Sequence, residues 1–294
     1  MTPSIMTRSL TIIIVNYNAG EHLGRCLQSL APALSGLDWQ AIVVDNASQD
    51  ASERQALAYG DRVRLVRLPT NLGFGAGVNR GAADTRDPFL LVLNPDAELA
   101  GAVVTDMLDE IDRFPDCAVL GPGILNEDGT VQGSARFDPT WLTGLFGRAR
   151  RLTRWFPNSS LARRNVRSPE LLPGESSVEV DWVSGACMLI RRVPFARCGG
   201  FDASFFLYWE DADLCRRLRT LAYTIRYVPR LRVRHVIGQS SRTVRPLAIR
   251  AFHASALRYY RKHIARGRLD AGIARAILAA RREWLLWRVQ RASS

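Results

Sequence analysis

The segment Thr11-Ile12-Ile13-Ile14-Val15 runs directly into Asn16-Tyr17-Asn18-Ala19-Gly20. The first half is a β-branched apolar run with the length of a buried strand, and the second half carries the polar residues and glycine of a turn. Apolar residues at helical spacing come next, namely Leu23, Cys26, Leu27 and Leu30. The segment therefore predicts a strand, a turn and a helix, which is the repeating unit of an α/β fold.

The same pattern recurs along the next eighty residues. We predict strands at 41–44, 63–66 and 89–93, with helical patterns between them and Ser48 as the N-cap of the helix after the second strand. This β-α-β-α order predicts a mainly parallel sheet with helices on both faces.

Polar residues follow three of these four strands. The first ends at Asn16, the second at Asp45-Asn46 and the fourth at Asn94-Pro95-Asp96. Turn chemistry alone would favour Asn and Asp at any one of these positions. Ligands of open α/β sheets bind beyond the carboxyl ends of the strands, so three such endings in series predict a ligand site there.

The second half of the chain is less regular. We predict a helix over 100–115, a strand with a glycine-marked turn over 178–190, and strands at 225–228 and 231–234, the last ending at His235. Beyond residue 245 we predict two helices broken near Gly267. In the second of them an apolar stripe is formed by Ile273, Ile277, Ala280, Trp284 and Trp287.

Composition narrows the class of protein. The 294 residues are 47% hydrophobic and 23% charged, which is typical of a globular protein. The first nine residues lack the apolar core of a signal peptide, and no run approaches the roughly 20 apolar residues of a membrane span. The five cysteines show no C-x-x-C spacing, which argues against a disulfide scaffold or zinc knuckle. We therefore expect a cytoplasmic protein with free thiols.

The net charge of +12 is concentrated in two segments. Residues 136–167 hold eight arginines against one aspartate, and residues 245–294 hold eleven arginines and one lysine against two acids. With these segments at +7 and +10, the remaining chain carries −5. A nucleic-acid binder more often spreads its basic surface over the fold, whereas basic segments with aromatics suit an anionic membrane surface.

The segment Asn71–Gly81 is rich in glycine, as dinucleotide-binding loops are. The spacing of its glycines does not match the dinucleotide-binding pattern. The pattern G-x-G-x-x-G would need glycine at Val78 or at Arg80. Such a segment can still bring backbone N–H groups close to a phosphate, or can simply allow tight helix–sheet packing.

Residues 205–214, Phe-Phe-Leu-Tyr-Trp-Glu-Asp-Ala-Asp-Leu, place three carboxylates directly after five large apolar residues. Carboxylates beside an apolar wall are costly to desolvate unless they are paired, bound to metal or used chemically. Alternatively, acids in the first turn of a helix only complement its positive end. The segment by itself leaves both interpretations open.

The motifs together resemble the inverting glycosyltransferases of family 2, which have the GT-A fold, and most of all their bacterial rhamnosyltransferase-type branch. The resemblance covers about residues 10–240 and rests on the order and spacing of Ile14-Val15-Asn16-Tyr17-Asn18, Val44-Asp45-Asn46-Ala47-Ser48, Asn71-Leu72-Gly73-Phe74-Gly75, Leu93-Asn94-Pro95-Asp96, Gly185-Ala186, Gly199-Gly200-Phe201-Asp202, Trp209-Glu210-Asp211-Ala212-Asp213-Leu214 and His235. It implies a GT-A domain over residues 1–245, with an Arg-rich insertion at about 137–177, and basic amphipathic helices over 246–294. The insertion is a lid, a membrane-facing loop or a solvated loop.

The resemblance also implies roles for individual residues. Asp211 would be the general base. Asp96 would hold Mg²⁺ or Mn²⁺ on the donor diphosphate, and His235 would be either a further metal ligand or a core histidine. The nucleotide sugar would contact Asn16, Asp45, Asn71, Gly73, Asn79 and Asn94. The acceptor pocket would be lined by Trp182, Gly185, Ala186, Trp209 and Glu210.

Two residues depart from the common family pattern. Asn94 and Asn46 each stand where a carboxylate is common, although the rhamnosyltransferase-type branch often has asparagine there. An amide offers a carbonyl oxygen without a charge, so a lower metal affinity is expected, or an ion that arrives with the diphosphate.

The resulting hypothesis is an inverting transferase. It would move a sugar, plausibly L-rhamnose from a dTDP donor, to a hydroxyl of a glycan or lipid-linked acceptor at the cytoplasmic face of the membrane. The rivals are a non-catalytic nucleotide-sugar-binding scaffold and a nucleic-acid-binding protein that uses its Arg-rich segments. The second rival leaves Asp45, Asp96 and Asp211 without a function.

Overall fold

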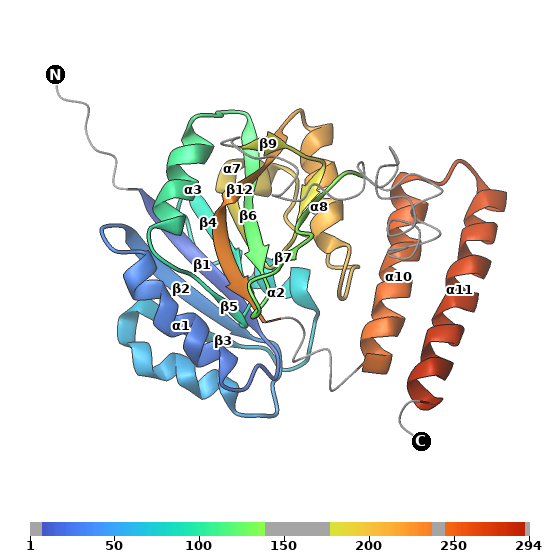
Figure 1. Cartoon of the computed structure of the whole chain (residues 1–294), viewed down its shortest axis with the longest axis horizontal. Helices are drawn as coiled ribbons and strands as arrows, with labels where there is room; N and C mark the ends of the chain where they lie inside the picture. The colour runs from blue at the N-terminus through green and yellow to red at the C-terminus, as the bar shows by residue number, and fades with distance from the viewer. Residues whose placement is uncertain (1–7, 139–176, 237–244, 292–294) are drawn as a thin grey trace.

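The computed structural model describes residues 8–138, 177–236 and 245–291 (Figure 1). A twisted central sheet carries helices on both faces, and two long C-terminal helices lie to one side of this body. The predicted insertion at 137–177 falls almost wholly outside the described residues.

The first half of the chain forms the predicted parallel unit. Strands β1, β2, β3 and β4 are separated by helix α1, the 3-10 helix η1 and helix α2. Their order is β1 Ser9–Asn16, α1 His22–Ala33, β2 Asp38–Asp45, η1 Ser52–Arg62, β3 Val63–Arg67, α2 Phe74–Ala82 and β4 Phe89–Leu93. Parallel pairing joins β3 to β2, β2 to β1 and β1 to β4, as the sequence predicts.

The second half completes the sheet with both strand directions. Its elements are β5 Ala97–Glu98, α3 Val103–Asp112, β6 Cys117–Leu125, β7 Val131–Gln132, β8 Ala135–Arg136, β9 Val178–Glu179, β10 Trp182–Val183, β11 Cys187–Arg191, α7 Arg192–Arg197, α8 Glu210–Thr220 and β12 Thr224–His235. The sheet order is β3-β2-β1-β4-β11-β6-β12-β5, with β11 antiparallel to β4 and β6, and β12 parallel to β6. The predicted helix over 100–115 is α3.

Strand β6 was not predicted, because its sequence contains Gly121-Pro122-Gly123, residues that usually mark turns. The structure explains two of them by close packing. A Cβ on Gly121 would lie 2.7 Å from the Val183 side chain, and one on Gly123 would lie 3.0 Å from the Pro229 carbonyl oxygen. The same crowding accompanies a register shift in β12, so the strands predicted at 225–228 and 231–234 are one bulged strand.

The prediction that Ser48 caps a helix is wrong. The helix η1 begins at Ser52, with Ala51 at the N-cap position. The Ser48 hydroxyl instead accepts hydrogen bonds from the backbone N–H of Asn18 and from the Asn16 amide. It therefore ties the loop after β2 to the loop after β1.

Two hydrophobic cores fill the two faces of the sheet. Ile12 and Ile14 of β1 point to the core that contains Leu23 of α1 and Met107 of α3. Ile13 and Val15 point to the opposite core, which contains residues of α2, α7 and α8 such as Val78, Phe195 and Leu214. The β1 side chains alternate between the faces and nearly all are buried on both, as expected for a strand covered on both sides.

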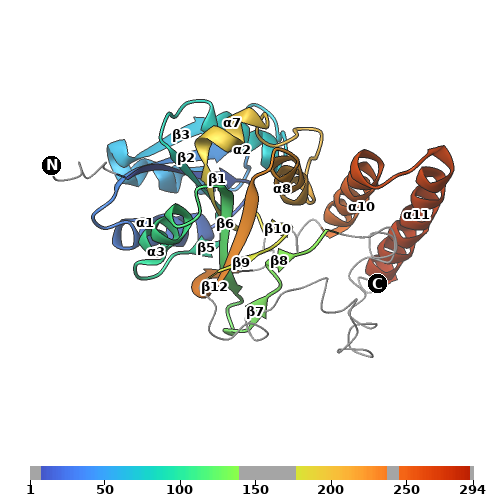
Figure 2. The ribbon, with the colours of Figure 1, turned by 90° about the horizontal axis from the view of Figure 1, so that it is seen from above.

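The C-terminal helices α10 Arg245–His263 and α11 Arg268–Arg291 form a hairpin, with the break where Gly267 predicts it. Figure 2 shows them side by side, with α10 nearer to the sheet. Helix α11 packs on α10 through residues that include Ala274 and Leu278. The predicted stripe on α11 largely faces solvent, since Ile273, Trp284 and Trp287 are each about half exposed.

Candidate functional site

The ends of β1 and β2 bring Asn16 and Asp45 side by side in register. The Asn16 Nδ2 group donates to Asp45 Oδ1 at 2.9 Å, to Ser48 Oγ at 3.0 Å and to Ser52 Oγ at 2.9 Å. Asn16 has no exposed surface and Asp45 is 4% exposed. The structure thus gives Asn16 the task of orienting Asp45 and the loop after β2, while its buried Oδ1 has no hydrogen-bond partner among the described residues.

Asn46 organises the glycine-rich segment. Its Nδ2 donates to the Gly73 carbonyl oxygen at 3.1 Å, and its Oδ1 accepts from the Leu72 backbone N–H at 2.9 Å. Asn71 adds a bond from the Gly73 N–H to its own Oδ1 at 2.9 Å. A carboxylate at position 46 has no proton to donate, so this arrangement requires an amide.

Asn79 is held by the backbone of Phe201. Its Nδ2 donates to the carbonyl at 2.7 Å and its Oδ1 accepts from the N–H at 2.9 Å. Asn79 therefore fastens α2 to the turn before α8, and its second amide N–H and second oxygen lone pair are not used by these two bonds.

Asp96 and His235 meet at the other end of the same edge of the sheet. The short strand β5 pairs with the end of β12, which places His235 opposite Ala97. The His235 Nε2 atom lies 3.1 Å from Asp96 Oδ1 and 3.1 Å from Asn94 Nδ2, and the side chains of Asp96 and His235 are each 12% exposed. The structure brings the predicted pair and Asn94 together.

Gln132 of β7 fixes the orientation of this histidine. Its Nε2 donates to the His235 carbonyl at 2.9 Å, so its Oε1 faces the ring Nδ1 at 3.2 Å and accepts a hydrogen bond from it. The ring Nε2 is then an acceptor, which faces the Asn94 amide and the Asp96 carboxylate. Imidazole with carboxylate is a donor set that suits Mn²⁺, and a metal ion bound here would take the place of the Asn94 hydrogen bond to Nε2. Within the described residues, no group of three or more His, Cys, Asp or Glu side chains forms a metal site, so a metal held here would take its other ligands from the donor diphosphate and water.

Asp211 lies in the first turn of α8, on the opposite side of the site. Its Oδ2 accepts from the Gly185 N–H at 3.1 Å and its Oδ1 from the Ala212 N–H at 2.8 Å. Immediately before the helix, Tyr208 and Trp209 have φ angles of 68° and 70°, in the left-handed region. Non-glycine residues held there cost about 1–3 kcal/mol each, which is typical of functional segments.

The neighbouring acids differ from Asp211. Burial and the nearby Asp211 raise the pKa of Glu210 to about 8, and its buried Oε2 has no hydrogen-bond partner among the described residues. Burial alone would raise the pKa of Asp213, but hydrogen bonds from His263 and Lys262 and the charge of Arg217 outweigh it and lower the value. Glu210 is thus neutral at pH 7 and Asp213 is charged and paired.

Backbone contacts join the two sides of the site. The Asn94 N–H donates to the Ala186 carbonyl at 3.0 Å, and the next residue back, Gly185, holds Asp211. On the other flank the Phe74 N–H donates to the Phe206 carbonyl at 3.0 Å. The segments predicted to bind donor, metal and acceptor therefore border one region.

The predicted acceptor residues gather beside the α8 start. Trp182 and Trp209 both pack against a small core of Phe205, Ala212 and Tyr259. Each indole Nε1 is buried without a partner among the described residues. Buried donors of this kind are rare, so two of them beside Asp211 suit a site that receives hydroxyl groups.

Comparisons with known proteins identify the family of the chain. The model of the family "Glycosyl transferase family 2" matches residues 11–167, more than half of the chain. The chain belongs to glycosyl transferase family 2. The N-acetylglucosaminyl-diphospho-decaprenol L-rhamnosyltransferase of Mycobacterium tuberculosis (strain ATCC 25618 / H37Rv) is 35% identical over 241 residues, which cover 78% of this chain and 76% of that protein. The low-salt glycan biosynthesis hexosyltransferase Agl10 of Haloferax volcanii is 29% identical over 219 residues, covering 73% of this chain and 62% of that protein.

Two solved structures share the fold of this glycosyltransferase at low sequence identity. GalNAc-T7 with UDP, GalNAc and Mn²⁺ has a TM-score of 0.57 at 15% identity, over 79% of this chain and 44% of that one. TarS 1-349 of S. aureus has a TM-score of 0.54 at 16% identity, over 92% of this chain and 70% of that one. The predicted GT-A fold and the predicted class, a nucleotide-sugar-dependent glycosyltransferase of rhamnosyl or hexosyl type, are confirmed.

Residues outside the sequence prediction also shape the site of this glycosyltransferase. Asn46 and Gln132 orient its loops, and Lys262 and His263 reach Asp213 from α10. The asparagine at a position where a carboxylate is common was a signal for Asn46. The other three residues have no local signal in the sequence, because each of them lies about fifty or more positions from its partner.

Proposed function

We propose that the protein is an inverting glycosyltransferase that moves L-rhamnose from dTDP-L-rhamnose to a hydroxyl of a lipid-linked diphosphate glycan in cell-surface polysaccharide synthesis. The observation that carries this proposal is the position of Asp211, held by Gly185 one residue from the segment that pairs with Asn94. The name of the mycobacterial relative supports rhamnose and a polyprenyl diphosphate acceptor.

The donor half of the proposed site is the edge formed by the ends of β1, β2 and β4. Asp45 would face the nucleotide base, with Asn16 orienting it, and Asn71 and Gly73 would border the ribose. Asn94 and Asp96 would border the diphosphate. Asn79 would border the ribose as well, while its amide also binds the backbone of Phe201.

A divalent cation, Mg²⁺ or Mn²⁺, would be held by Asp96 and His235. The acceptor Nε2 of His235, 3.1 Å from the Asp96 carboxylate, supports this assignment. A bound cation supplies positive charge that stabilises a diphosphate leaving group.

The acceptor half uses Asp211 as the general base. Its two backbone hydrogen bonds and its place at the positive end of α8 favour the anion, which can take a proton from the acceptor hydroxyl during attack. Attack from the face opposite the diphosphate inverts the anomeric carbon in a single displacement. Trp182, Gly185, Ala186, Trp209 and the neutral carboxyl group of Glu210 would line the acceptor pocket.

The C-terminal hairpin would bring the enzyme to the cytoplasmic face of a membrane, where such acceptors lie. Helix α11 exposes Trp284 and Trp287, and Arg288 and Arg291 stack on these rings at 4.9 and 4.3 Å. Aromatic and basic side chains on one helix suit the interface of anionic lipids. None of the helices in the described ranges has both the length and the apolar character to cross a bilayer.

A non-catalytic nucleotide-sugar-binding scaffold is the main alternative. It would leave the two strained residues before α8 and the buried partnerless groups of Glu210 and the tryptophans unexplained. A nucleic-acid-binding function would leave Asp45, Asp96 and Asp211 unexplained as well.

The test is an assay of nucleotide release and product formation. The protein is incubated with a panel of nucleotide sugars, Mg²⁺ or Mn²⁺, and a short-chain prenyl-diphospho-N-acetylglucosamine. We expect dTDP-L-rhamnose to be consumed with equal amounts of dTDP and rhamnosylated lipid. Binding of a donor without turnover by any acceptor would favour the scaffold, and failure of every donor to bind would refute the enzyme proposal.

A further inference from the structure

Helix α10 contacts the α8 region with one continuous face. The residues involved are Phe252, Ser255, Tyr259, Lys262 and His263, which recur at helical spacing over three turns. Their partners all belong to the segment from Asp202 to Arg217 or to Asp138. The sequence prediction assigned this helix to a separate basic extension, so these contacts were not expected.

The first turns of this face hold the strained residues before α8. The ring of Phe252 lies 5.7 Å from that of Tyr208 and 5.9 Å from that of Trp209. The Ser255 hydroxyl donates to the Leu207 carbonyl oxygen at 2.9 Å, and the Tyr259 ring lies 5.1 Å from Trp209. Left-handed conformations at non-glycine residues persist only where the surroundings impose them, and here α10 supplies much of those surroundings.

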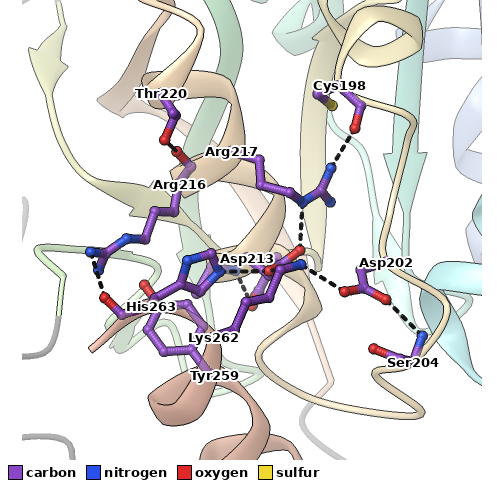
Figure 3. Close-up of polar contacts among 12 residues, drawn as sticks. Cys198, Asp202, Ser204, Asp213, Arg216, Arg217, Thr220, Tyr259, Lys262 and His263 are labelled. Carbon is purple, nitrogen blue, oxygen red and sulfur yellow. Dashed lines mark hydrogen bonds and ion pairs between the residues drawn. The ribbon is translucent and has the colours of Figure 1, made fainter. Parts of the chain in front are cut away.

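The last turn of the face reaches a buried carboxylate of α8 (Figure 3). Asp213 is fully buried, and its Oδ1 lies 2.7 Å from Lys262 Nζ and 2.7 Å from His263 Nε2. Lys262 also contacts Asp202 Oδ2 at 2.6 Å, and Arg217 holds the other Asp213 oxygen at 2.7 Å. Lys262 therefore joins the turn before α8 to the first turn of the helix itself.

We propose that α10 is part of the catalytic machinery, with Lys262 as the residue through which it positions Asp211. This inference rests on the proposed function, because it takes Asp211 as the general base. In the sequence, Asp211 lies between two segments that α10 contacts, Leu207 to Trp209 before it and Asp213 after it. Removal of Lys262 leaves Asp213 with Arg217 and His263, so α8 keeps its fold while its first turn loses the link to Asp202.

The experiment compares three variants of the full chain in the transfer assay. Lys262→Met removes the charge and keeps the length, Lys262→Arg keeps the charge, and Arg261→Met removes a charge from the adjacent exposed residue as a control. We expect Lys262→Met to lower kcat about 10- to 100-fold with KM for the donor within twofold, because small misplacements of a reacting group cost up to about 10²-fold. Lys262→Arg should recover most of the loss, and Arg261→Met should match the wild type. Equal kcat values for Lys262→Met and Arg261→Met would overturn the proposal.

Two further measurements separate positioning from stability and from failure of the proposed function. Lys262→Met and Asp213→Asn combined should lower kcat by less than the product of the two single effects, since each substitution removes the contact between Lys262 and Asp213. Amide hydrogen exchange at residues 207–213 should be faster in Lys262→Met than in Arg261→Met, whether or not any sugar is transferred. A wild type that transfers nothing would refute the enzyme proposal alone, while unchanged exchange would refute the positioning proposal alone.

Discussion

Asp96 and Asp211 lie on the two sides of the site and are held in different ways. Asp96 follows β4 directly, and pairing of β5 with β12 sets its neighbour His235 opposite Ala97. Asp211 follows a loop with two left-handed residues, and α10 contacts the residues on both sides of it with side chains from forty to fifty positions farther along the chain. The proposed donor side is therefore built by the backbone of the sheet, and the proposed acceptor side by packing on a helix.

The difference has a physical reason. Transferases of this type all have to bind a diphosphate. The carboxyl ends of the strands provide a rigid edge for such a binding site. Acceptors vary in shape, so the base side is built from loops and a helix that can differ without disturbing the sheet. Substitutions on the two sides should then have separable effects.

The largest effect is expected from Asp211→Asn. Loss of a general base lowers the rate by about 10²–10⁴-fold, so transfer should fall by about 10³-fold, while calorimetric affinity for dTDP stays within twofold of the wild type. The exposed Asp61→Asn serves as a control for the loss of one acid. Weakened donor binding in Asp211→Asn would show that the two sides are not separable.

A smaller effect is expected from Asp96→Ala, and it should appear in donor binding instead of in the rate of transfer. Removal of one of two protein ligands should weaken Mn²⁺-dependent dTDP binding by about 10–100-fold, as for losses around other metal sites, and the affinity measured without metal should hardly change. Glu98→Ala, two residues along on β5, is the matched control. Retention of the Mn²⁺ dependence would remove Asp96 from the metal site.

The contact between the glycine-rich segment and the loop before α8 can be disrupted at Gly73. A Cβ there would lie 2.2 Å from the Phe206 carbonyl oxygen, and the φ angle is +90°. Gly73→Ala should lower the free energy of unfolding by about 3 kcal/mol, from backbone strain and overpacking together. Gly36→Ala has a similar φ of +80° with open space around it, so it measures the strain alone and should cost about 1 kcal/mol. The free energies of unfolding are measured by urea denaturation. Equal losses for Gly73→Ala and Gly36→Ala would show that the close approach of Gly73 to Phe206 does not contribute to stability.

The last prediction concerns the pH dependence of stability caused by Glu210. Its pKa rises from 4.5 to about 8 on folding, so the native state binds more protons than the unfolded state between these values. The free energy of unfolding of the wild type should therefore fall as pH rises from 5 to 8, relative to Glu210→Gln, with a slope of at most about 1.4 kcal/mol per pH unit. Parallel pH profiles for the two proteins would show that Glu210 is not held neutral.

The position of the proposed donor residues at one edge of the sheet could be predicted from the sequence. Asn16, Asp45 and Asp96 come directly after apolar strands, and parallel strands bring their carboxyl ends together wherever the loops go. The contact of Asn79 with Phe201 was not predicted, because it spans more than 120 positions. Strand β6 was not predicted because its glycines are required by close packing against Val183 and Pro229, and these residues are distant in sequence.

The sequence by itself determined the α/β fold and the family, and it predicted the edge of the sheet where we place the donor side, because these follow from local periodicity and from residues adjacent to strands. Only the tertiary structure decided that Asn46 has to be an amide, that Gln132 sets the ring of His235, and that α10 grips the start of α8. Each of these depends on which groups meet across long stretches of chain. For Asp211, the sequence identified the residue, and the folded contacts on both sides of it identify what holds it in place.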